Sequence, residues 1–291
     1  MNLYRFGIDA VRSCYVSLKS LRFVGDWRSG AMKAGLALLI FLTMSFIALP
    51  MASLFLKSPL DTVLRSLYSP MVVDALKLSL STSAVSTMIV VLLGTPLAYV
   101  NARFRYPGKE IADSLIDLPV IMPPAVAGIA LLMAFGRMGI VGQHLNAIGI
   151  SIAFTTLAVI IAQIFVSSPF YIRQARTSFD DVDLSIENAT RTLGASRAYT
   201  FFHVILPIAC NGLVSGAIMA FARSLGEFGA TIMFAGNFQG RTQTMPLAIY
   251  TAMQGDLDAA LCLAIILVII SLLVIFLVKT LTRRMCGNAG N

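Results

Sequence analysis

Long apolar runs separated by short polar segments dominate the sequence. Six of these runs approach or exceed the roughly 20 residues that a helix needs to cross a bilayer. They lie at residues 35–55, 75–100, 114–135, 152–172, 204–225 and 257–281. The runs are continuously apolar, without the alternation of period two that is typical of a membrane β-barrel. Because a helix satisfies its own backbone hydrogen bonds in lipid, the pattern predicts an all-α integral membrane protein with six spans.

Composition and charge add a location and an orientation. Hydrophobic residues make up 57% of the 291 positions and charged residues 12%, against about 25% charged in soluble domains. Most Lys and Arg lie in residues 1–33, 103–109, 173–197 and 279–284. Inner loops carry the excess of basic residues, so both termini are predicted on the cytoplasmic side of the plasma membrane. The outer side keeps Lys57, Arg65, Lys77, Arg137, Arg223 and Arg241.

The net charge of +8 is therefore mainly a signal of topology. Lys and Arg do not form one stripe with interleaved aromatics, so no nucleic-acid partner is expected. The sequence has no clustered catalytic set and no GxxxxGK[ST] phosphate loop. His144 and His203 fall on opposite sides of the predicted membrane, so no metal site is expected either. We expect a transport protein rather than an enzyme, driven by another chain or by an ion gradient.

Residues 1–33 precede the first span. Arg5, Arg12, Lys19 and Asp26 recur every seven residues with apolar residues between them. This spacing favours a basic amphipathic helix in the inner headgroup region, and a loosely ordered tail is the alternative. Residues 34–284 then form the transmembrane domain, and residues 285–291 form a C-terminal tail.

A charged segment, ENATRTLGASRAYTFFHVILP at residues 187–207, lies between the fourth and fifth spans. As a helix over residues 184–202, it would place Leu184, Thr192, Ala195 and Tyr199 on one face, and Glu187, Arg191 and Arg197 toward water or a partner. Gly194 permits a sharp bend there. Pro207 suits the first turn of the next helix. The segment is either a docking loop for another protein or a solvated surface helix.

Prolines interrupt the third span at Pro119, Pro123 and Pro124. Proline removes a backbone hydrogen bond, so this span is either a bent, pore-lining helix or a span that begins at Pro123.

The end of the fifth span carries Arg223 and Glu227, four residues apart and therefore able to pair on one helical face. Gly226 and Gly229 permit close packing or a break. Ionisable residues near a span predict a substrate path or a gate, with a structural ion pair as the alternative.

The next segment, residues 236–256, is too polar to span the membrane and is predicted to be a folded outer loop. Arg241, Thr242, Gln243 and Thr244 could meet an anion or a protein that delivers it. Ordinary solvation of the loop is the alternative.

Residues 187–207 resemble the EAA loop of permease subunits of binding-protein-dependent ATP-binding-cassette importers. The glycine of that loop corresponds to Gly194, which Ala195 follows, and its ending corresponds to Leu206 and Pro207. The acidic position falls on Asn188, with Ala189 and Thr190 after it, and Glu187 stands one place early. By this resemblance, residues 180–203 would be a cytoplasmic coupling loop.

Three further segments resemble the molybdate/tungstate permeases: PVIMPPAVAGIALLMAFGRMGIVG, SSPFYIRQARTSFDDVD and residues 222–260, which contain GEFGAT and GRTQTMPLAIY. The resemblance implies a six-helix type I importer domain that works by alternating access as a homodimer. It also implies two ATPase subunits that hold ATP and Mg, an extracytoplasmic oxyanion-binding protein, and no cofactor in this chain. A sulfate/thiosulfate importer permease is the alternative, and an ion-coupled secondary transporter is a further one.

Overall fold

The computed structural model describes residues 30–57 and 69–287, which fall into two units that divide after Lys57. The first unit contains one described helix, α2 (Gly30–Lys57), whose apolar stretch Ala34–Lys57 is long enough to span a membrane. Helix α2 begins at Gly30, so residues 30–33 belong to it rather than to the predicted N-terminal segment. The rest of that segment, Arg65 and residues 288–291 lie outside the described residues.

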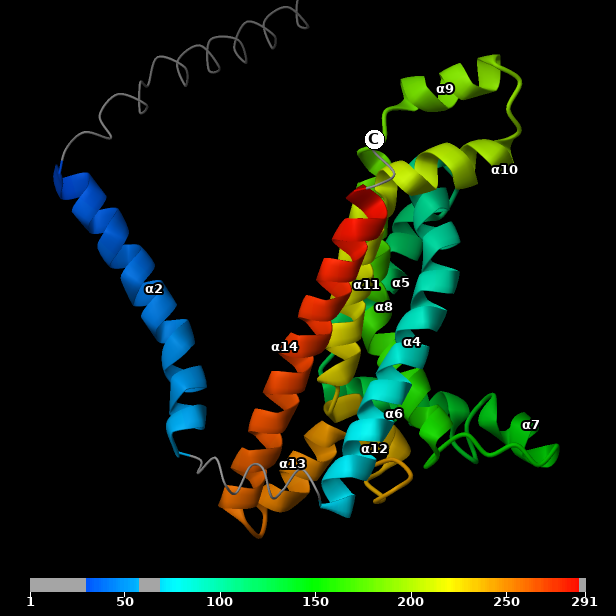
Figure 1. Ribbon diagram of the computed structural model, residues 1–291. Helices are drawn as coiled ribbons and strands as arrows, with labels where there is room; N and C mark the ends of the chain where they lie inside the picture. Colours follow the sequence, from blue (N-terminus) through cyan, green and yellow to red (C-terminus); the bar gives the residue numbers. More distant parts are fainter. Residues whose placement is uncertain (1–29, 58–68, 288–291) are drawn as a thin grey trace, which may run out of the picture. The chain divides into compact units, whose positions relative to one another are not determined.

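The second unit is a helical bundle with short helices at both ends (Figure 1). Its long helices are α4 (Pro70–Arg103), α8 (Thr156–Asp180), α11 (Leu206–Leu225) and α14 (Leu257–Gly287). At one end lie α9 (Leu184–Thr192) and α10 (Arg197–Thr200), and a π-helical turn (Phe201–Ile205) joins α10 to α11. The opposite end carries α6 (Pro124–Phe135), α7 (Gly142–Ala147), α12 (Gly229–Ala235) and α13 (Met245–Met253), while α5 (Lys109–Ile121) packs against α8. The described residues are almost entirely helical, as the apolar pattern predicts.

The third predicted span, residues 114–135, is not one straight helix. Helices α5 and α6 meet at a bend of 117°. The chain is extended at Met122 and Pro123, with ψ angles of 134° and 135°, because a residue before proline is pushed out of the helical region. Counting the bent pair as one span, the described residues contain up to six candidate spans.

The fourth predicted span is displaced along the sequence. Residues 152–155 precede the helix, because Thr155 caps α8 by accepting a hydrogen bond from the Ala158 N–H, and α8 continues to Asp180. The second and fifth predicted spans are longer than predicted: α4 begins at Pro70, and a nearly continuous helix covers Arg197–Leu225.

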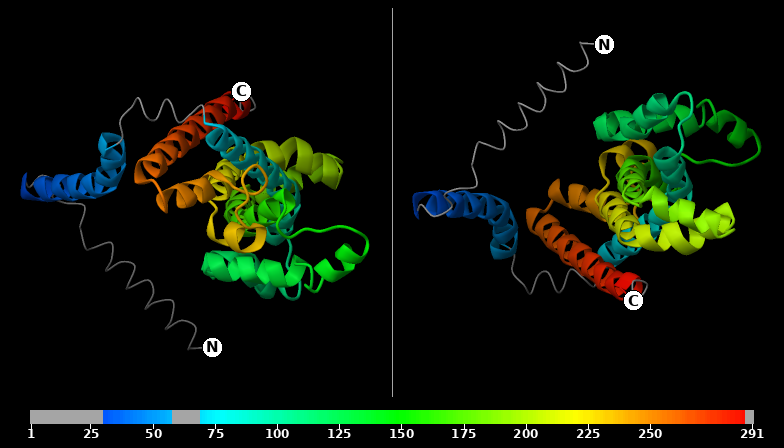
Figure 2. Two further views of the ribbon diagram at one scale, coloured as in Figure 1. Left: turned by 90° about the horizontal axis from the view of Figure 1, so that it is seen from below. Right: turned by 90° about the horizontal axis from the view of Figure 1, so that it is seen from above.

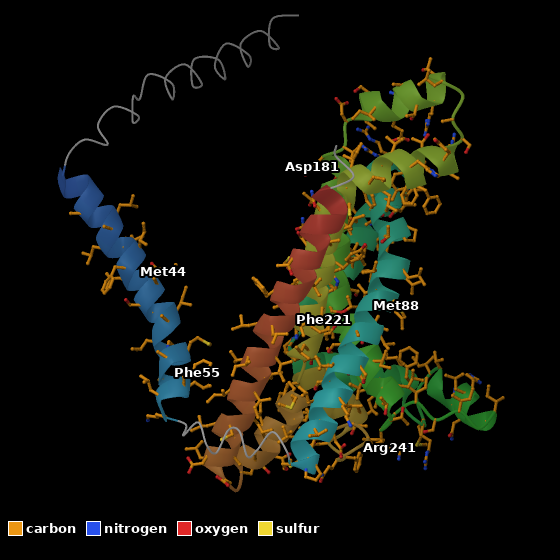
Figure 3. The ribbon with its side chains drawn as sticks, in the orientation of Figure 1. Met44, Phe55, Met88, Asp181, Phe221 and Arg241 are labelled. Carbon is orange, nitrogen blue, oxygen red and sulfur yellow. The ribbon has the colours of Figure 1, made fainter. Side chains whose placement is uncertain are left out.

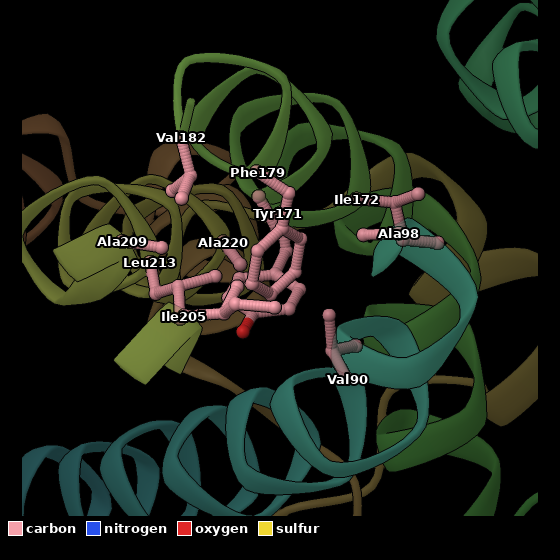
Figure 4. Packing of buried hydrophobic residues seen from close by; sticks show 11 residues of the cluster. Val90, Ala98, Tyr171, Ile172, Phe179, Val182, Ile205, Ala209, Leu213 and Ala220 are labelled. Carbon is pink, nitrogen blue, oxygen red and sulfur yellow. The ribbon is translucent and has the colours of Figure 1, made fainter. Parts of the chain in front are cut away.

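Helix α8 lies at the centre of the bundle and packs against both α4 and α11. The close approach depends on small residues: a Cβ on Gly94 would lie 2.8 Å from Tyr171 Cδ1, and a Cβ on Gly216 would lie 3.1 Å from Gln174 Cβ. Such residues favour helix association in membranes, because apolar side chains alone gain little there. Figure 4 shows Tyr171 and Phe179 packed with Ile205 and other members of this core.

A second apolar core joins α6, α8 and α12 near the other end of the bundle, where Leu131, Val159 and Phe234 are buried. In the two end views, α14 and the α5–α7 segment lie on opposite sides of the central helices (Figure 2). The sequence-predicted site residues lie at the two opposite ends of this bundle.

Candidate functional site

The α9–α10 segment projects from one end of the bundle (Figure 1). Asp183 caps α9, because the Ser185 backbone N–H donates to its Oδ1 at 2.8 Å, and this bond lowers the pKa of the Asp183 carboxyl. Helix α9 ends at Thr192, and Gly194 takes a left-handed conformation with φ of 85°, a common way to end a helix. Residues 184–202 are therefore not one continuous helix, and the bend occurs at Gly194, where the sequence permits it.

Glu187 also differs from the prediction, because its side chain turns into the protein and is 7% exposed as a residue. Its Oε1 accepts a hydrogen bond from Arg191 Nη2 at 2.7 Å. Its Oε2 lies 3.5 Å from Nε of Arg103, the last residue of α4. The buried carboxylate is stabilised by these two cations rather than offered to water.

The predicted docking residues divide into two groups. Thr190, Gly194 and Ala195 line an open depression of about 480 Å³ with Leu193, Ser196 and Tyr199, and Asn188 and Ala189 are exposed on α9 beside it. Leu206 and Pro207 instead begin α11, where Leu206 lines a separate apolar groove of about 560 Å³.

Sequence reasoning missed the apolar character of this depression. Leu193 is 87% exposed and Tyr199 54% exposed, and Leu184 and Ile186 on α9 are exposed as well. Large apolar side chains exposed together on a projecting segment indicate a surface for another protein. A leucine directly before the helix-ending glycine was the available signal.

Arg223 and Glu227 form the predicted pair at the other end of the bundle, with 2.7 Å between Nη1 and Oε2. Helix α11 ends at Leu225, and Gly226 follows it as the C-cap. Glu227 is 1% exposed, and its Oε1 accepts a hydrogen bond from the Ala230 N–H at 2.8 Å. The charge of Arg223 is thus already neutralised by a buried carboxylate.

This ion pair lies where the two broken segments meet. A Cβ on Gly229 would lie 2.5 Å from Pro124 Cβ, and one on Gly128 would lie 2.7 Å from the Ala230 carbonyl oxygen. Helix α12 therefore packs closely on α6, and Pro124 comes close to the Glu227 turn, with the exposed Pro123 just before it. The close packing comes from Gly229 and Gly128, whereas Gly226 ends its helix.

The four predicted loop residues do not share one surface. Arg241 is exposed near this end of the bundle (Figure 3), whereas Thr242, Gln243 and Thr244 are buried. Thr242 Oγ1 accepts the Phe238 N–H at 3.0 Å. The prediction of an exposed polar cluster was wrong for these three residues, because they pack inward and Thr242 holds the turn together.

Two polar groups in the bundle were not singled out from the sequence. Ser83 and Ser86 on α4 face Gln163 on α8, with 2.8 Å between Ser86 Oγ and Gln163 Oε1. The recurrence of Ser and Thr over residues 79–87 was the available signal.

The second group lines a pocket of about 440 Å³ between α5 and α8. It contains ion pairs of Arg173 with Asp117 at 2.5 Å and of Arg176 with Asp113 at 2.9 Å. Asp180 lies 3.8 Å from Arg176 in the same pocket. Charges in separate sequence segments meet here, so no local pattern revealed the pocket.

Comparison with known proteins agrees with this arrangement of helices. Residues 90–286 match the family described as the binding-protein-dependent transport system inner membrane component. The molybdenum transport system permease protein ModB of Mycobacterium tuberculosis is 44% identical over 79% of this chain and 87% of its own length. The corresponding protein of Escherichia coli K12 is 40% identical over 74% of this chain and 96% of its own. The sulfate transport system permease protein CysT of the same organism is 36% identical over 74% and 78%.

Solved structures show the same fold at low sequence identity. A chain of a bacterial ABC transporter involved in the import of the acidic polysaccharide alginate has a TM-score of 0.70 at 16% identity, covering 87% of this chain and 95% of its own. A chain of the MetNI methionine ABC transporter in an inward-facing conformation has a TM-score of 0.56 at 17% identity, covering 75% and 96%. This chain therefore belongs to the family of binding-protein-dependent transport system inner membrane components.

Proposed function

We propose that this chain is the membrane-spanning permease subunit of an ATP-driven importer of molybdate and tungstate. The observation that carries the proposal is the higher identity to molybdenum permeases than to a sulfate permease. The GEFGAT and GRTQTMPLAIY segments, which carry the sequence resemblance, form the turns at Glu227 and Arg241 and the first residues of α12 and α13. The sulfate/thiosulfate branch is the competing candidate.

The two ends of the bundle support the proposed partners. Basic residues favour a cytoplasmic location for the α9 end and for both termini. Two ATPase subunits, which bring ATP and Mg, would each receive one α9–α10 segment at the depression beside Leu193 and Tyr199. Two copies of the chain would form the pathway, in contact with membrane lipid. An extracytoplasmic oxyanion-binding protein would meet the end that carries Arg241.

Transport would proceed by alternating access. ATP closes the ATPase pair and draws the two α9–α10 segments together, and the bundle shifts from inward-open to outward-open. Hydrolysis allows the return. A partner shifts this equilibrium only if its ATP-bound and empty forms favour different permease states. This chain contributes the docking segment and the path, and the ATPase site lies on the partner.

The Arg223–Glu227 turn is the proposed gate of the path. A dianion is costly to carry through hydrocarbon, so its path needs polar walls. Ser224 and Thr231 flank the turn, and their buried hydroxyl oxygens have no hydrogen-bond partner among the described residues. The neutralised Arg223 supports passage with weak binding, which suits a pathway that must release its substrate quickly.

The deciding experiment is ATP-driven uptake of labelled molybdate into liposomes that hold the permease and its ATPase, with the capture protein outside. We expect uptake that excess sulfate does not reduce and that tungstate blocks. Sulfate-sensitive uptake would move the assignment to the sulfate branch. Uptake without ATP would identify a secondary transporter instead.

A further inference from the structure

Glu187 is buried although it belongs to the docking segment, residues 184–200. A carboxylate that binds a partner directly should be exposed. Burying an ionised carboxylate is costly unless a cation compensates it. Of its two cations, Arg191 lies four residues along the same helix and moves with it. Arg103 belongs to α4, so it connects α9 to the membrane bundle.

Arg103 holds the start of α9 at two points. Its Nη2 donates to the carbonyl oxygen of Val182 at 2.7 Å, and its Nε faces Glu187 Oε2 at 3.5 Å. The side chains of Arg103 and Glu187 are each 8% exposed, so solvent screens their attraction little.

The contact between Arg103 and Glu187 joins two buried atoms at a longer distance than a hydrogen bond. Arg103 Nε and Glu187 Oε2 are both buried, and neither atom has a hydrogen-bond partner among the described residues. Their 3.5 Å separation is an electrostatic contact rather than a hydrogen bond. A displacement of α9 would therefore change this distance together with the bond from Arg103 Nη2 to the Val182 carbonyl oxygen.

The far end of α4 reaches the opposite side of the bundle. Ser79 is fully buried there, and its Oγ accepts the Met245 N–H at 2.7 Å, directly after the Thr242–Thr244 turn. Helix α4 has 34 residues, or about 50 Å at 1.5 Å per residue. One helix thus contacts the docking segment at one end and the turn beside Arg241 at the other.

We propose that Arg103 is a positioning residue that links α9 to α4, so that displacement of α9 by the ATPase moves α4 in the membrane. This inference rests on the proposed function, which supplies the ATPase. Arg103 does not touch the partner. It sets the position of α9 relative to the bundle.

The test compares Arg103→Gln with Arg105→Gln in the complete transporter in liposomes. Both variants remove one positive charge, but Arg105 is exposed just beyond α4. We expect Arg103→Gln to assemble with the ATPase and hydrolyse ATP, while the molybdate imported per ATP falls roughly tenfold, a typical coupling energy between sites. The ratio of imported molybdate to hydrolysed ATP should be the same in Arg105→Gln as in the unaltered transporter. An unchanged ratio in Arg103→Gln would overturn the proposal.

Two further variants separate positioning from a general loss of fold. Arg103→Lys keeps the charge but not the paired Nε and Nη2 contacts, so its ratio should be intermediate. Arg103→Gln/Glu187→Gln removes both charges of the contact, so its ratio of imported molybdate to hydrolysed ATP should be no lower than that of Arg103→Gln alone, where the contact is already lost. A clear further loss in the double variant would contradict the proposal.

Amide hydrogen exchange on the assembled complex gives a result independent of substrate. Arg103→Gln should speed exchange over residues 184–192 relative to Arg105→Gln, while exchange in α8 stays unchanged. If the unaltered complex imports no molybdate, the proposed substrate fails and this comparison still decides the role of Arg103. Equal exchange over residues 184–192 in the two variants would refute it.

Discussion

The Arg223–Glu227 pair predicts an asymmetry between its two partners. Removing one member of a buried pair costs about 3–5 kcal/mol, because the other charge is left uncompensated. Glu227 has a side-chain exposure of 1% and Arg223 of 29%. Arg223→Met strands the buried carboxylate and should cost about 3 kcal/mol, at the lower end because Arg223 is partly screened by water. Glu227→Gln strands a cation that can reach water, and its amide oxygen can still accept the Ala230 N–H, so it should cost about 1 kcal/mol.

The assay is SDS titration of the permease in mixed micelles, followed by far-ultraviolet circular dichroism. Arg137→Met is the matched control, because it removes the same charge from an exposed position and should change stability by less than about 0.5 kcal/mol. The double variant Arg223→Met/Glu227→Gln should recover most of the loss, since no charge is left buried. The reasoning is refuted if Arg223→Met costs no more than Glu227→Gln.

Three other substitutions test the docking depression and the packing. Nothing lies within 4 Å of a Cβ on Gly194, so Gly194→Trp should leave the bundle folded but fill the depression and uncouple ATP hydrolysis from uptake. Gly194→Ala is the control, because it brings strain at the same φ of 85° without filling the depression. Normal uptake by Gly194→Trp would contradict the docking role. Gly128→Val should lower the free energy of unfolding by about 3 kcal/mol in the SDS titration, because the Ala230 backbone cannot move aside as a side chain could. A smaller loss in Gly128→Val than in Gly128→Ala would be inconsistent with tight packing. Gln163→Leu should cost only about 0.6 kcal/mol in the same titration, because Ser86 Oγ keeps its bond to the Thr82 carbonyl oxygen. A loss of several kcal/mol would show that the polar contacts dominate the interface between α4 and α8.

Local features of the sequence predicted local features of the structure. The four-residue spacing of Arg223 and Glu227 predicted their ion pair, and Gly194 marked the end of α9. The prolines at 123 and 124 marked the break between α5 and α6, although the size of the bend did not follow from them. These predictions succeeded because spacing and backbone restrictions act within one or two turns of helix.

Features that depend on distant segments were not predictable in this way. Glu187 turns inward because Arg103 comes from another helix, and helical periodicity along residues 184–202 contains no information about that partner. Thr242 and Thr244 look like solvated loop residues in sequence, yet the following Met245 N–H bonds to Ser79 on α4 and the turn is buried. The tertiary partner decides the exposure of a polar residue in both cases.

The arginines of α4, α8 and α11 would let the proposed anion path avoid binding its substrate tightly. Arg103, Arg173, Arg176 and Arg223 belong to α4, α8 and α11, and each lies within ion-pair distance of a carboxylate. A passing dianion would have to compete with that carboxylate, which lowers its affinity for the arginine while the charged groups keep the region hydrated. Tight capture would then belong to a separate binding protein, as expected for a family whose transport depends on one. Two of these arginines also join different helices, Arg103 joining α4 to α9 and Arg173 joining α8 to α5, so the groups that would weaken substrate binding would also hold the helices that must move.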